Sequence, residues 1–276
     1  MIALDIDGTL TDSTHTIPDR VMDHLTAIEA MNWKIAFITG RILSYALRAL
    51  EGCPFPYLIG VQNGADILQF PGEHLLKQFY LNGEEVVEIL GHFQGVEWLL
   101  YGGAGGGDCC YFDEAMWGKS DYDLGRLKSL SRTPWRAIGT WEEIRQMPAF
   151  SLIKGIGERE PLEALKERLF DVANIHTICI EDPIFAGHSL LLITHAQANK
   201  GGAAGYCREH WGLKNSPLIV AGDDYNDVPL FQVADYTIAM ENGITALKER
   251  ADIIAPPHSE MGIIQGLELA IAHYTC

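Results

Sequence analysis

The sequence is 276 residues long, enough for one large domain or for two ordinary domains that each have a hydrophobic core. Its hydrophobic content of 47% and charged content of 21% are typical of a globular protein. The 20 basic and 37 acidic residues give a formal net charge of -17, which argues against a nucleic-acid or anionic-membrane surface. An anionic small molecule is not excluded, because a bound metal ion can reverse the field inside a pocket.

The cysteine pattern and the hydropathy both favour a cytoplasmic protein. The six cysteines show neither a Cys-x-x-Cys pair nor a zinc-ligand spacing, so we expect reduced thiols, although adjacent Cys109 and Cys110 could bond to each other. We expect no signal peptide, because the first predicted strand begins at Ile2. No apolar run approaches the roughly 18 residues that a membrane helix needs, so no membrane contact is expected.

Short, nearly continuous apolar runs predict strands that are covered on both faces. In chain order these runs are IALDI from Ile2, KIAFIT from Lys34, YLIGVQ from Tyr57, PLIVAG from Pro217 and YTIAM from Tyr236. Segments of helical spacing separate them and close the chain. Strand-helix alternation of this kind predicts a doubly wound parallel sheet, a Rossmann-like α/β core.

The middle of the chain follows a less regular pattern. Strand-like and helical segments are mixed between about Leu81 and Gly187, which predicts an inserted α+β domain. The parent sheet is expected to resume at HSLLLIT, which begins at His188. The predicted domains are therefore residues 1–81 and 187–276 for the parent domain and residues 82–186 for the insertion.

A glycine-rich stretch, Tyr101 to Asp123, lies within this insertion. Its glycines, Gly102 to Gly107, match neither the dinucleotide fingerprint nor the P-loop, so a flexible hairpin connection is expected. If the insertion covers an active site, Trp117 and Tyr122 are candidate substrate contacts.

Two carboxylates, Asp5 and Asp7, follow the first predicted strand directly. Residues two apart on a strand face the same side, so both carboxylates are expected in one crevice at the carboxyl end of the sheet. Gly8 permits a sharp turn there, and Thr9 can stabilise it. Because two close carboxylates repel each other, either one stays protonated or a cation lies between them.

Donor groups follow two other predicted strands. Thr39 and Gly40 precede a helix, where a hydroxyl and free backbone N–H groups would form an anion site. Lys200 opens another predicted helix and, placed in the crevice, would neutralise the charge of a phosphate and a nucleophile. Taken alone, each feature is also typical of an ordinary helix start or a solvated lysine.

An acidic cluster follows the strand predicted from Pro217. The segment GDDYNDVPLF contains Asp223, Asp224, Asn226 and Asp227, and oxygen ligands of this kind suit Mg²⁺. An EF-hand is excluded because its glycine and final glutamate are missing. All four features lie at predicted strand ends, and together they supply a nucleophile, anion donors, a counter-charge and metal ligands.

These segments resemble the haloacid dehalogenase-like (HAD) superfamily, specifically its Cof-type phosphatases. The matching motifs, in chain order, are DIDGTLTD, FITGR, VQNGADI, NKGGA and GDDYNDVPLF. The resemblance covers residues 1 to about 68 and from about 189 onward. It implies that the Rossmann-like core is a HAD catalytic domain and that residues 82–186 form a C2-type cap, which closes over the site and selects the substrate.

The resemblance implies a Mg²⁺-dependent phosphatase that acts on small phosphorylated metabolites, such as sugar phosphates or phosphorylated cofactors. Asp5 would attack phosphorus and become an aspartyl-phosphate, while Asp7 would act as general acid and base. Metal ligands would be Asp5, the Asp7 backbone carbonyl and Asp223.

The remaining motif residues are expected around the phosphate. Thr39, Gly40 and Lys200 would stabilise the transferring phosphoryl group, and Asn226 would contact the phosphate or a metal-bound water. Asp227 would hold Lys200 in place. Asp224 would lie beside the site, and Arg41 would shape the substrate entrance.

Other functions of the same fold are weighed against hydrolysis. An ion pump would lack the Asp7 carboxylate and would need membrane helices. A phosphomutase would share Asp7 and would need several arginines in its cap. The insertion does contain arginines, but they are scattered along its sequence, so this alternative stays open. A non-catalytic protein that binds a phosphorylated ligand also stays open, although a pure binder gains little from two repelling carboxylates. The oligomeric state is not predicted.

Overall fold

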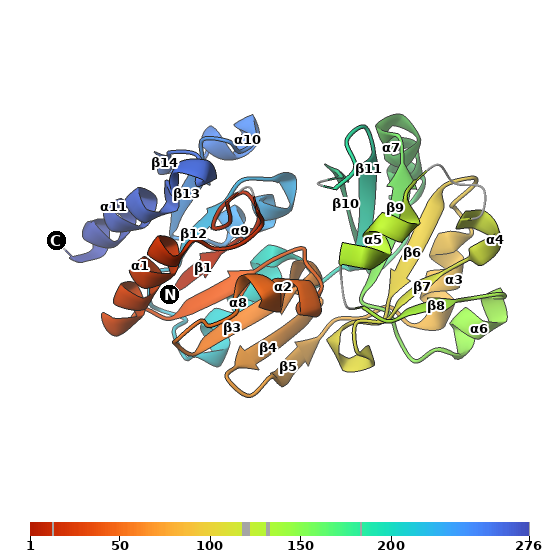
Figure 1. Ribbon diagram of the computed structural model, residues 1–276, viewed down its shortest axis with the longest axis horizontal. Helices are drawn as coiled ribbons and strands as arrows, with labels where there is room; N and C mark the ends of the chain where they lie inside the picture. Colours follow the sequence, from red (N-terminus) through yellow and green to blue (C-terminus); the bar gives the residue numbers. More distant parts are fainter. Residues whose placement is uncertain (13, 118–121, 131–132, 183, 276) are drawn as a thin grey trace. The chain divides into compact units, whose positions relative to one another are not determined.

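The computed structural model describes residues 1–12, 14–117, 122–130, 133–182 and 184–275. The chain forms two compact units (Figure 1). The first unit comprises Met1–Arg41, Ala46–Lys77 and Asn199–Cys276, and the second comprises Ile42–Tyr45 and Gln78–Ala198.

The first unit is built on an eight-stranded sheet with the order β14-β13-β12-β1-β2-β3-β4-β5 in the described residues. The strands from β14 to β3 are parallel, β4 is antiparallel to β3, and β5 adds the edge. Their bounds are β1 (Ile2–Leu4), β2 (Ile35–Ile38), β3 (Tyr57–Val61), β4 (Asp66–Phe70), β5 (His74–Gln78), β12 (Ile219–Gly222), β13 (Tyr236–Met240) and β14 (Ile253–Ala255).

Helices cover this parallel sheet, as βαβ crossovers require. They are α1 (Asp19–Ala30), α2 (Leu43–Ala49), α8 (Lys200–His210), α9 (Val228–Gln232), α10 (Thr245–Lys248) and α11 (Ile263–Thr275). Helix α11 packs on β13 and β14 and contacts α1, while α8 packs on β2 and β3 (Figure 1). The central strands β1, β2 and β12 are buried throughout, which explains why their sequences are nearly continuous apolar runs.

The second unit contains a mixed sheet with the order β10-β11-β9-β6-β7-β8 in the described residues. Its strands pair antiparallel except for β7 and β8. Their bounds are β6 (Glu97–Tyr101), β7 (Cys110–Phe112), β8 (Trp135–Ala137), β9 (Leu152–Gly157), β10 (Ile175–Glu181) and β11 (Ser189–His195). The helices are α3 (Gly83–Leu90), α4 (Glu114–Trp117), α5 (Leu124–Leu130), α6 (Trp141–Gln146) and α7 (Arg159–Arg168).

The two faces of this second sheet carry different hydrophobic clusters. One cluster joins Ile153 and Leu191 of the sheet to buried residues of α3, α6 and α7. The other is rich in aromatic residues and is called the aromatic face below. Its buried members are Leu99, Tyr101, Cys110, Phe112, Trp117, Tyr122, Leu127, Leu152, Ile156, Leu190 and Leu192.

The predicted doubly wound sheet with an inserted α+β region is confirmed as a fold class, but the predicted return at residue 187 differs from the structure. The run at Ser189–His195 forms β11, which pairs antiparallel with β9 and β10 of the second sheet. The chain rejoins the first unit only at Asn199. The sequence pattern could not assign this strand to the correct sheet. A central strand of either sheet is covered on both faces and is therefore a nearly continuous apolar run.

The glycine-rich stretch connects two paired strands, β6 and β7, through a short 3-10 turn at Ala104–Gly106. Trp117 and Tyr122, the candidate substrate contacts, are buried in the aromatic face. The indole N–H of Trp117 donates to the Trp98 carbonyl at 3.1 Å, and the Tyr122 hydroxyl donates to Asp182 at 2.7 Å. Their polar atoms therefore already have partners inside the second unit, and residues 118–121 of the stretch lie outside the described residues.

Five cysteines are free thiols in the described residues, so Cys109 and Cys110 do not bond to each other. Cys276 lies outside the described residues. Within the described part of the chain, no helix is long and apolar enough to cross a membrane.

Candidate active site

Three neighbouring parallel strands end at the same edge of the first sheet. Strand β1 lies between β2 and β12, with Ile2 in register with Ile35 and with Ile219. Asp5, Thr39 and Asp223 follow these strands, so the fold brings together three segments that are far apart in sequence. The Asp5 amide still donates to the Ala221 carbonyl at 3.1 Å, which fixes the backbone of Asp5 against β12.

Lys200, the first residue of α8, lies between two carboxylates. Its ammonium group is 2.5 Å from Asp5 Oδ1 and 2.7 Å from Asp227 Oδ1. All three side chains are buried, and only 1% of Lys200 is exposed. Burial disfavours the charged ammonium, but the carboxylates of Asp227 and Asp5 outweigh it and raise the pKa of Lys200, which favours its charged form.

Asp227 also shapes the loop that carries Asp223. Its second oxygen, Oδ2, accepts the backbone N–H groups of Asp223 at 2.9 Å and Asp224 at 3.0 Å. Asp224 caps the 3-10 turn at Tyr225–Asp227, and its side chain accepts the Tyr225 amide. Asp227 thus positions both Lys200 and the loop, whereas Asp224 stabilises the turn.

The carboxylates of Asp5, Asp223 and Asp227 form a cluster in which one oxygen from each lies within 4.8 Å of the others. Burial raises the pKa of Asp5, and burial together with the Asp227 charge raises the pKa of Asp223 to about 7. Such repulsion is relieved by a divalent cation, and an all-oxygen donor set suits one. The cluster contains two members of the predicted metal set, Asp5 and Asp223, and adds Asp227, while the predicted backbone carbonyl of Asp7 is not a side-chain group and stays a prediction.

Gly8 lets the opening loop approach Asp223 closely. A methyl group built at Gly8 would lie 2.1 Å from Asp223 Oδ2, and the backbone φ of Gly8 is +69°. The hydroxyl of the neighbouring Thr9 lies 3.3 Å from Asp223 Oδ1 and donates to it. The turn residues after β1 therefore hold a carboxylate from another strand end.

Asp7 lies beyond the end of β1 at Leu4, so residues 5–7 no longer alternate as on a strand. Arg41 forms a bidentate pair with Asp7 and also donates to the His15 carbonyl at 3.2 Å. Each carboxylate has its own cationic hydrogen-bond donor, Lys200 for Asp5 and Arg41 for Asp7, and Lys200 also interacts electrostatically with Asp7. Arg41 contacts the proposed general acid, a role that the sequence analysis did not assign to it.

Thr39 and Gly40 lie beside two asparagines. Thr39 is fully buried, and its hydroxyl accepts the Arg41 amide at 3.1 Å. A methyl group built at Gly40 would lie 3.4 Å from Asn63 Oδ1 and 3.5 Å from Asn226 Nδ2. Asn226 donates to Asn63 at 3.1 Å, while the buried Oδ1 of Asn226 has no hydrogen-bond partner among the described residues.

Asn63 was not singled out from the sequence, although it lies in the NGA segment. It has a left-handed backbone (φ +58°), and its amide donates to the Thr39 carbonyl at 2.9 Å. An Asn-Gly pair directly after a buried strand is the signal that could have identified it, because asparagine tolerates this conformation.

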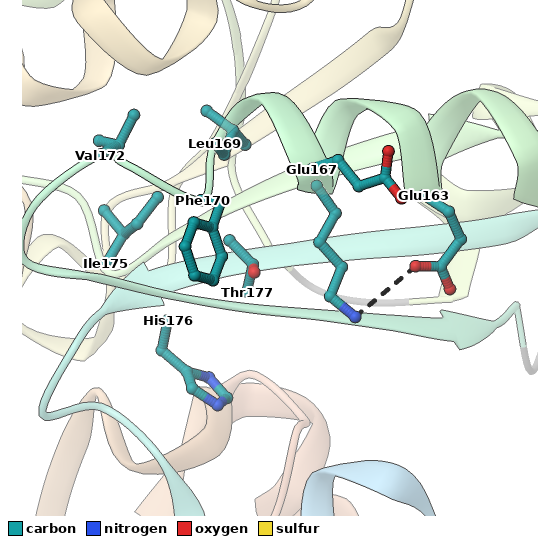
Figure 2. Close-up of a pocket in the computed structure, with 9 residues that line it drawn as sticks. Glu163, Glu167, Leu169, Phe170, Val172, Ile175, His176 and Thr177 are labelled. Atoms are coloured by element: carbon teal, nitrogen blue, oxygen red, sulfur yellow. Dashed lines mark ion pairs between the residues drawn. The ribbon is translucent and has the colours of Figure 1, made fainter.

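A pocket of about 490 Å³ lies elsewhere, in the second unit between the end of α7 and β10 (Figure 2). Its lining includes exposed Phe170 and the ion pair of Lys166 with Glu163, at 3.6 Å. None of the residues that line it belongs to the carboxylate cluster. The buried site at the end of the first sheet is therefore the candidate active site.

Comparisons with known proteins identify the family of the chain. The model of the haloacid dehalogenase-like hydrolase family matches residues 2–267. A phosphoglycolate phosphatase of Archaeoglobus fulgidus is 24% identical over 97% of this chain and 95% of its own length.

Two solved structures share the fold. SMU.1108c of Streptococcus mutans has a TM-score of 0.81 at 17% identity and 98% coverage of both chains. The HAD subclass IIB sugar phosphatase BT4131 has a TM-score of 0.74 at 22% identity and 97% coverage of both chains. The chain therefore belongs to the haloacid dehalogenase-like hydrolases, and it is a phosphoric monoester hydrolase of that family.

Proposed function

We propose that this phosphatase is Mg²⁺-dependent and hydrolyses phosphomonoesters of small metabolites, sugar phosphates or phosphorylated cofactors, through an aspartyl-phosphate on Asp5. The observation that carries the proposal is the buried Lys200, shared by Asp5 and Asp227 next to a third carboxylate, Asp223. A cytoplasmic location, as expected from the sequence, is part of the same proposal.

Asp5 is suited to be the nucleophile. Its Oδ1 accepts from Lys200, while Oδ2 has no hydrogen-bond partner among the described residues. Oδ2 attacks phosphorus, a bond from Asp5 to phosphorus forms, and the ester P–O bond breaks. Lys200 then stays beside the Asp5 carboxyl group and offsets the charge of the entering phosphoryl group.

Asp7 is the proposed proton carrier. It donates a proton to the departing alkoxide and later takes a proton from the water that attacks the aspartyl-phosphate. That second attack breaks the bond between phosphorus and Asp5 and restores the carboxylate. Arg41 holds Asp7 in place between the two steps.

Asp5, Asp223 and the Asp7 backbone carbonyl would hold the metal ion, with Asp227 and Thr9 orienting Asp223. When bound, Mg²⁺ supplies positive charge that offsets the repulsion between the phosphate and the carboxylates. The unpartnered Oδ1 of Asn226 fits this assignment, since a metal-bound water can donate to it.

The phosphoryl oxygens are proposed to lie against the Thr39 hydroxyl, the Gly40 amide and Lys200. The side chains of Asn63 and Asn226 border the space beside Gly40, within van der Waals contact of a methyl group built there. The role of residues 82–186 as the substrate-selecting domain is part of the same proposal. The names of the similar phosphatases, which act on phosphoglycolate and on sugar phosphates, support a small substrate.

The test is phosphate release from a panel of phosphorylated metabolites, with Mg²⁺ or with EDTA, and with Asp5→Asn as the blank. We expect Mg²⁺-dependent turnover that the substitution abolishes. Equal phosphate release by the wild type and by Asp5→Asn would refute the assignment of the nucleophile.

A further inference from the structure

Strand β10, Ile175–Glu181, forms one edge of the second sheet in the described residues and is seven residues long. The other edge strands of the two sheets are shorter, with three residues in β8, three in β14 and five in β5. Proteins protect such edges with short strands and with lysine or proline, because an unpaired edge accepts another strand. Arg136 lies on β8, Lys77 lies on β5 and Pro256 follows β14 directly, whereas β10 contains no lysine, arginine or proline.

The backbone of β10 presents hydrogen-bonding groups along this edge. At the two ends of its pairing with β11, Ala196 donates to the Asn174 carbonyl at 2.7 Å and Asp182 donates to that of His188 at 2.9 Å. Bonding to an antiparallel neighbour involves every second residue, so the even-numbered residues of β10 bond to β11 and the odd-numbered residues direct their N–H and C=O groups outward. None of these outward groups has a partner among the described residues. They belong to Ile175, Thr177, Cys179 and Glu181.

Apolar side chains border the same edge. Cys179 belongs to the cluster that includes α7, whereas Ile178 and Ile180 pack against the aromatic face, so β10 has an apolar side chain on both faces of the sheet. At the end of α7, the ring of Phe170 lines the same pocket as Ile175 and is 87% exposed (Figure 2). A large exposed ring beside an unpaired strand is typical of an interaction surface.

The strand is complementary to a second copy of itself. If two copies of β10 pair antiparallel with Ile178 opposite Ile178, each outward residue lies opposite an outward residue of the other copy. Thr177 then exchanges backbone hydrogen bonds with Cys179 of the second copy. A shift by one position would place outward groups opposite inward ones, and a larger shift would leave part of the strand unpaired.

The same register opposes no like charges. Glu181, the one acidic residue of the strand, lies at its exposed end and forms no ion pair among the described residues. In the paired strands it lies opposite Ile175 of the second copy, beside the pocket that Lys166 also lines. Lys166 pairs with Glu163 of its own copy at 3.6 Å, and Glu181 would bring a second carboxylate toward it.

We propose that the edge of β10 binds a second copy of this chain, so that the two second sheets join across a two-fold axis at Ile178. Main-chain hydrogen bonds supply the contact, and an identical surface on both copies makes it closed and symmetric. One pair of short strands buries less area than a standard interface, so we expect a dissociation constant of about micromolar. The contact uses no residue of the carboxylate cluster and is therefore independent of the proposed function.

The test is sedimentation velocity of the full chain over protein concentrations on both sides of that value. We expect a monomer–dimer equilibrium for the wild type. Thr177→Pro removes an outward N–H group from each copy, at a position where an edge strand tolerates proline, and should weaken the dimer about 100-fold or more. Ile254→Lys is the matched control, because it changes an exposed residue on the edge strand β14 of the first sheet and should leave the dissociation constant unchanged.

Two charge variants test the register. Ile178→Lys and Ile178→Glu each place like charges opposite each other at the two-fold axis, so each variant alone should be monomeric. An equal mixture of the two places a lysine opposite a glutamate and should restore the dimer. Restoration by mixing requires that both variants are folded, so a folding defect cannot produce this result.

Three results would overturn the proposal. A wild type that stays monomeric would leave the edge to a strand of another protein, and a dimer that survives in Ile178→Lys would use another surface. Open-ended oligomers in place of a dimer would show a contact without two-fold symmetry. Monomers in the mixture of two folded, monomeric Ile178 variants would reject the pairing of Ile178 with itself.

Discussion

The guanidinium group of Arg41 donates two hydrogen bonds to the carboxylate of Asp7, at 2.7 Å from Nε to Oδ2 and 2.6 Å from Nη2 to Oδ1. Only 3% of the Arg41 side chain is exposed, against 44% of the Asp7 side chain. Burial alone would raise the pKa of Asp7, but the hydrogen bonds and charge of Arg41 lower it. Arg41 therefore controls how readily the proposed general acid gives up its proton.

Arg41→Gln should move the pH dependence of the reaction. Asp7 must be protonated to donate to the leaving group, so kcat/KM for an alkyl phosphate falls as the pH rises above the pKa of Asp7. Since Arg41 lowers that pKa, its removal should move the alkaline limb of the profile to higher pH. His15→Gln, which alters a weaker contact at 3.5 Å, should move it less. If the alkaline limb of the pH profile does not move, or moves to lower pH, Asp7 is not the general acid.

Asp7→Asn should discriminate between leaving groups. An alkoxide needs a proton to depart, whereas p-nitrophenolate is stable without one, so the substitution should slow alcohol release far more from glycerol phosphate than from p-nitrophenyl phosphate. General acid catalysis typically contributes about 10²- to 10⁴-fold, and we expect a loss in that range for glycerol phosphate. Single-turnover rates of glycerol and p-nitrophenol release give the answer, because the later reaction with water is common to both esters. A similar loss for both would assign Asp7 a structural role.

The sequence predicted five strands of the first sheet, because these strands are buried and form nearly continuous apolar runs, but it did not predict β4, β5 or β14. The runs at Ile2, Lys34 and Tyr57 became β1, β2 and β3, and those at Pro217 and Tyr236 became β12 and β13. The run at Ser189–His195 was placed in the wrong sheet, because an apolar strand does not specify its neighbours. Which strands pair with one another depends on contacts between residues far apart in the sequence, and a local sequence pattern does not predict these contacts.

The residues that gather at the site could also be predicted from the sequence, but the side-chain partners within the site could not. Motif spacing indicated that Lys200, Asp227 and Asp223 would follow strand ends near Asp5, and the structure brings them together. The pairing of Asp7 with Arg41 could not be derived, because the chain leaves β1 before Asp7 and the strand alternation no longer applies. Side-chain partners in loops depend on turn geometry rather than on sequence period.

Lys200→Met should destabilise the metal-free protein strongly. The substitution leaves Asp5 and Asp227 buried without their cation, which typically costs about 3–5 kcal/mol in the free energy of unfolding. Denaturant unfolding in EDTA measures the loss. Lys34→Met removes an exposed partner of Glu29 and should cost less than about 1 kcal/mol. A loss for Lys200→Met as small as that of the control would mean that the buried carboxylates are protonated.

Gly8→Ala should weaken metal binding. The new methyl group would collide with the Asp223 carboxylate and displace it, in addition to the strain of a positive φ. Gly52→Ala is a matched control, because Gly52 also has a positive φ (+78°) but has nothing within 4 Å of a new methyl group. We expect a higher Mg²⁺ concentration for half-maximal activity in Gly8→Ala alone. If both variants respond alike, backbone strain and not the position of Asp223 governs the effect.

The most direct measurement is the location of a phosphoryl group on the protein during turnover. The enzyme is mixed with substrate and Mg²⁺, quenched in acid and mapped by peptide mass spectrometry. We predict a phosphoryl group on the peptide that contains Asp5, absent from Asp5→Asn and from samples without Mg²⁺. Phosphate release by the wild type with no phosphorylated Asp5 at any quench time, and undiminished release by Asp5→Asn, would contradict the proposed role of the carboxylate cluster.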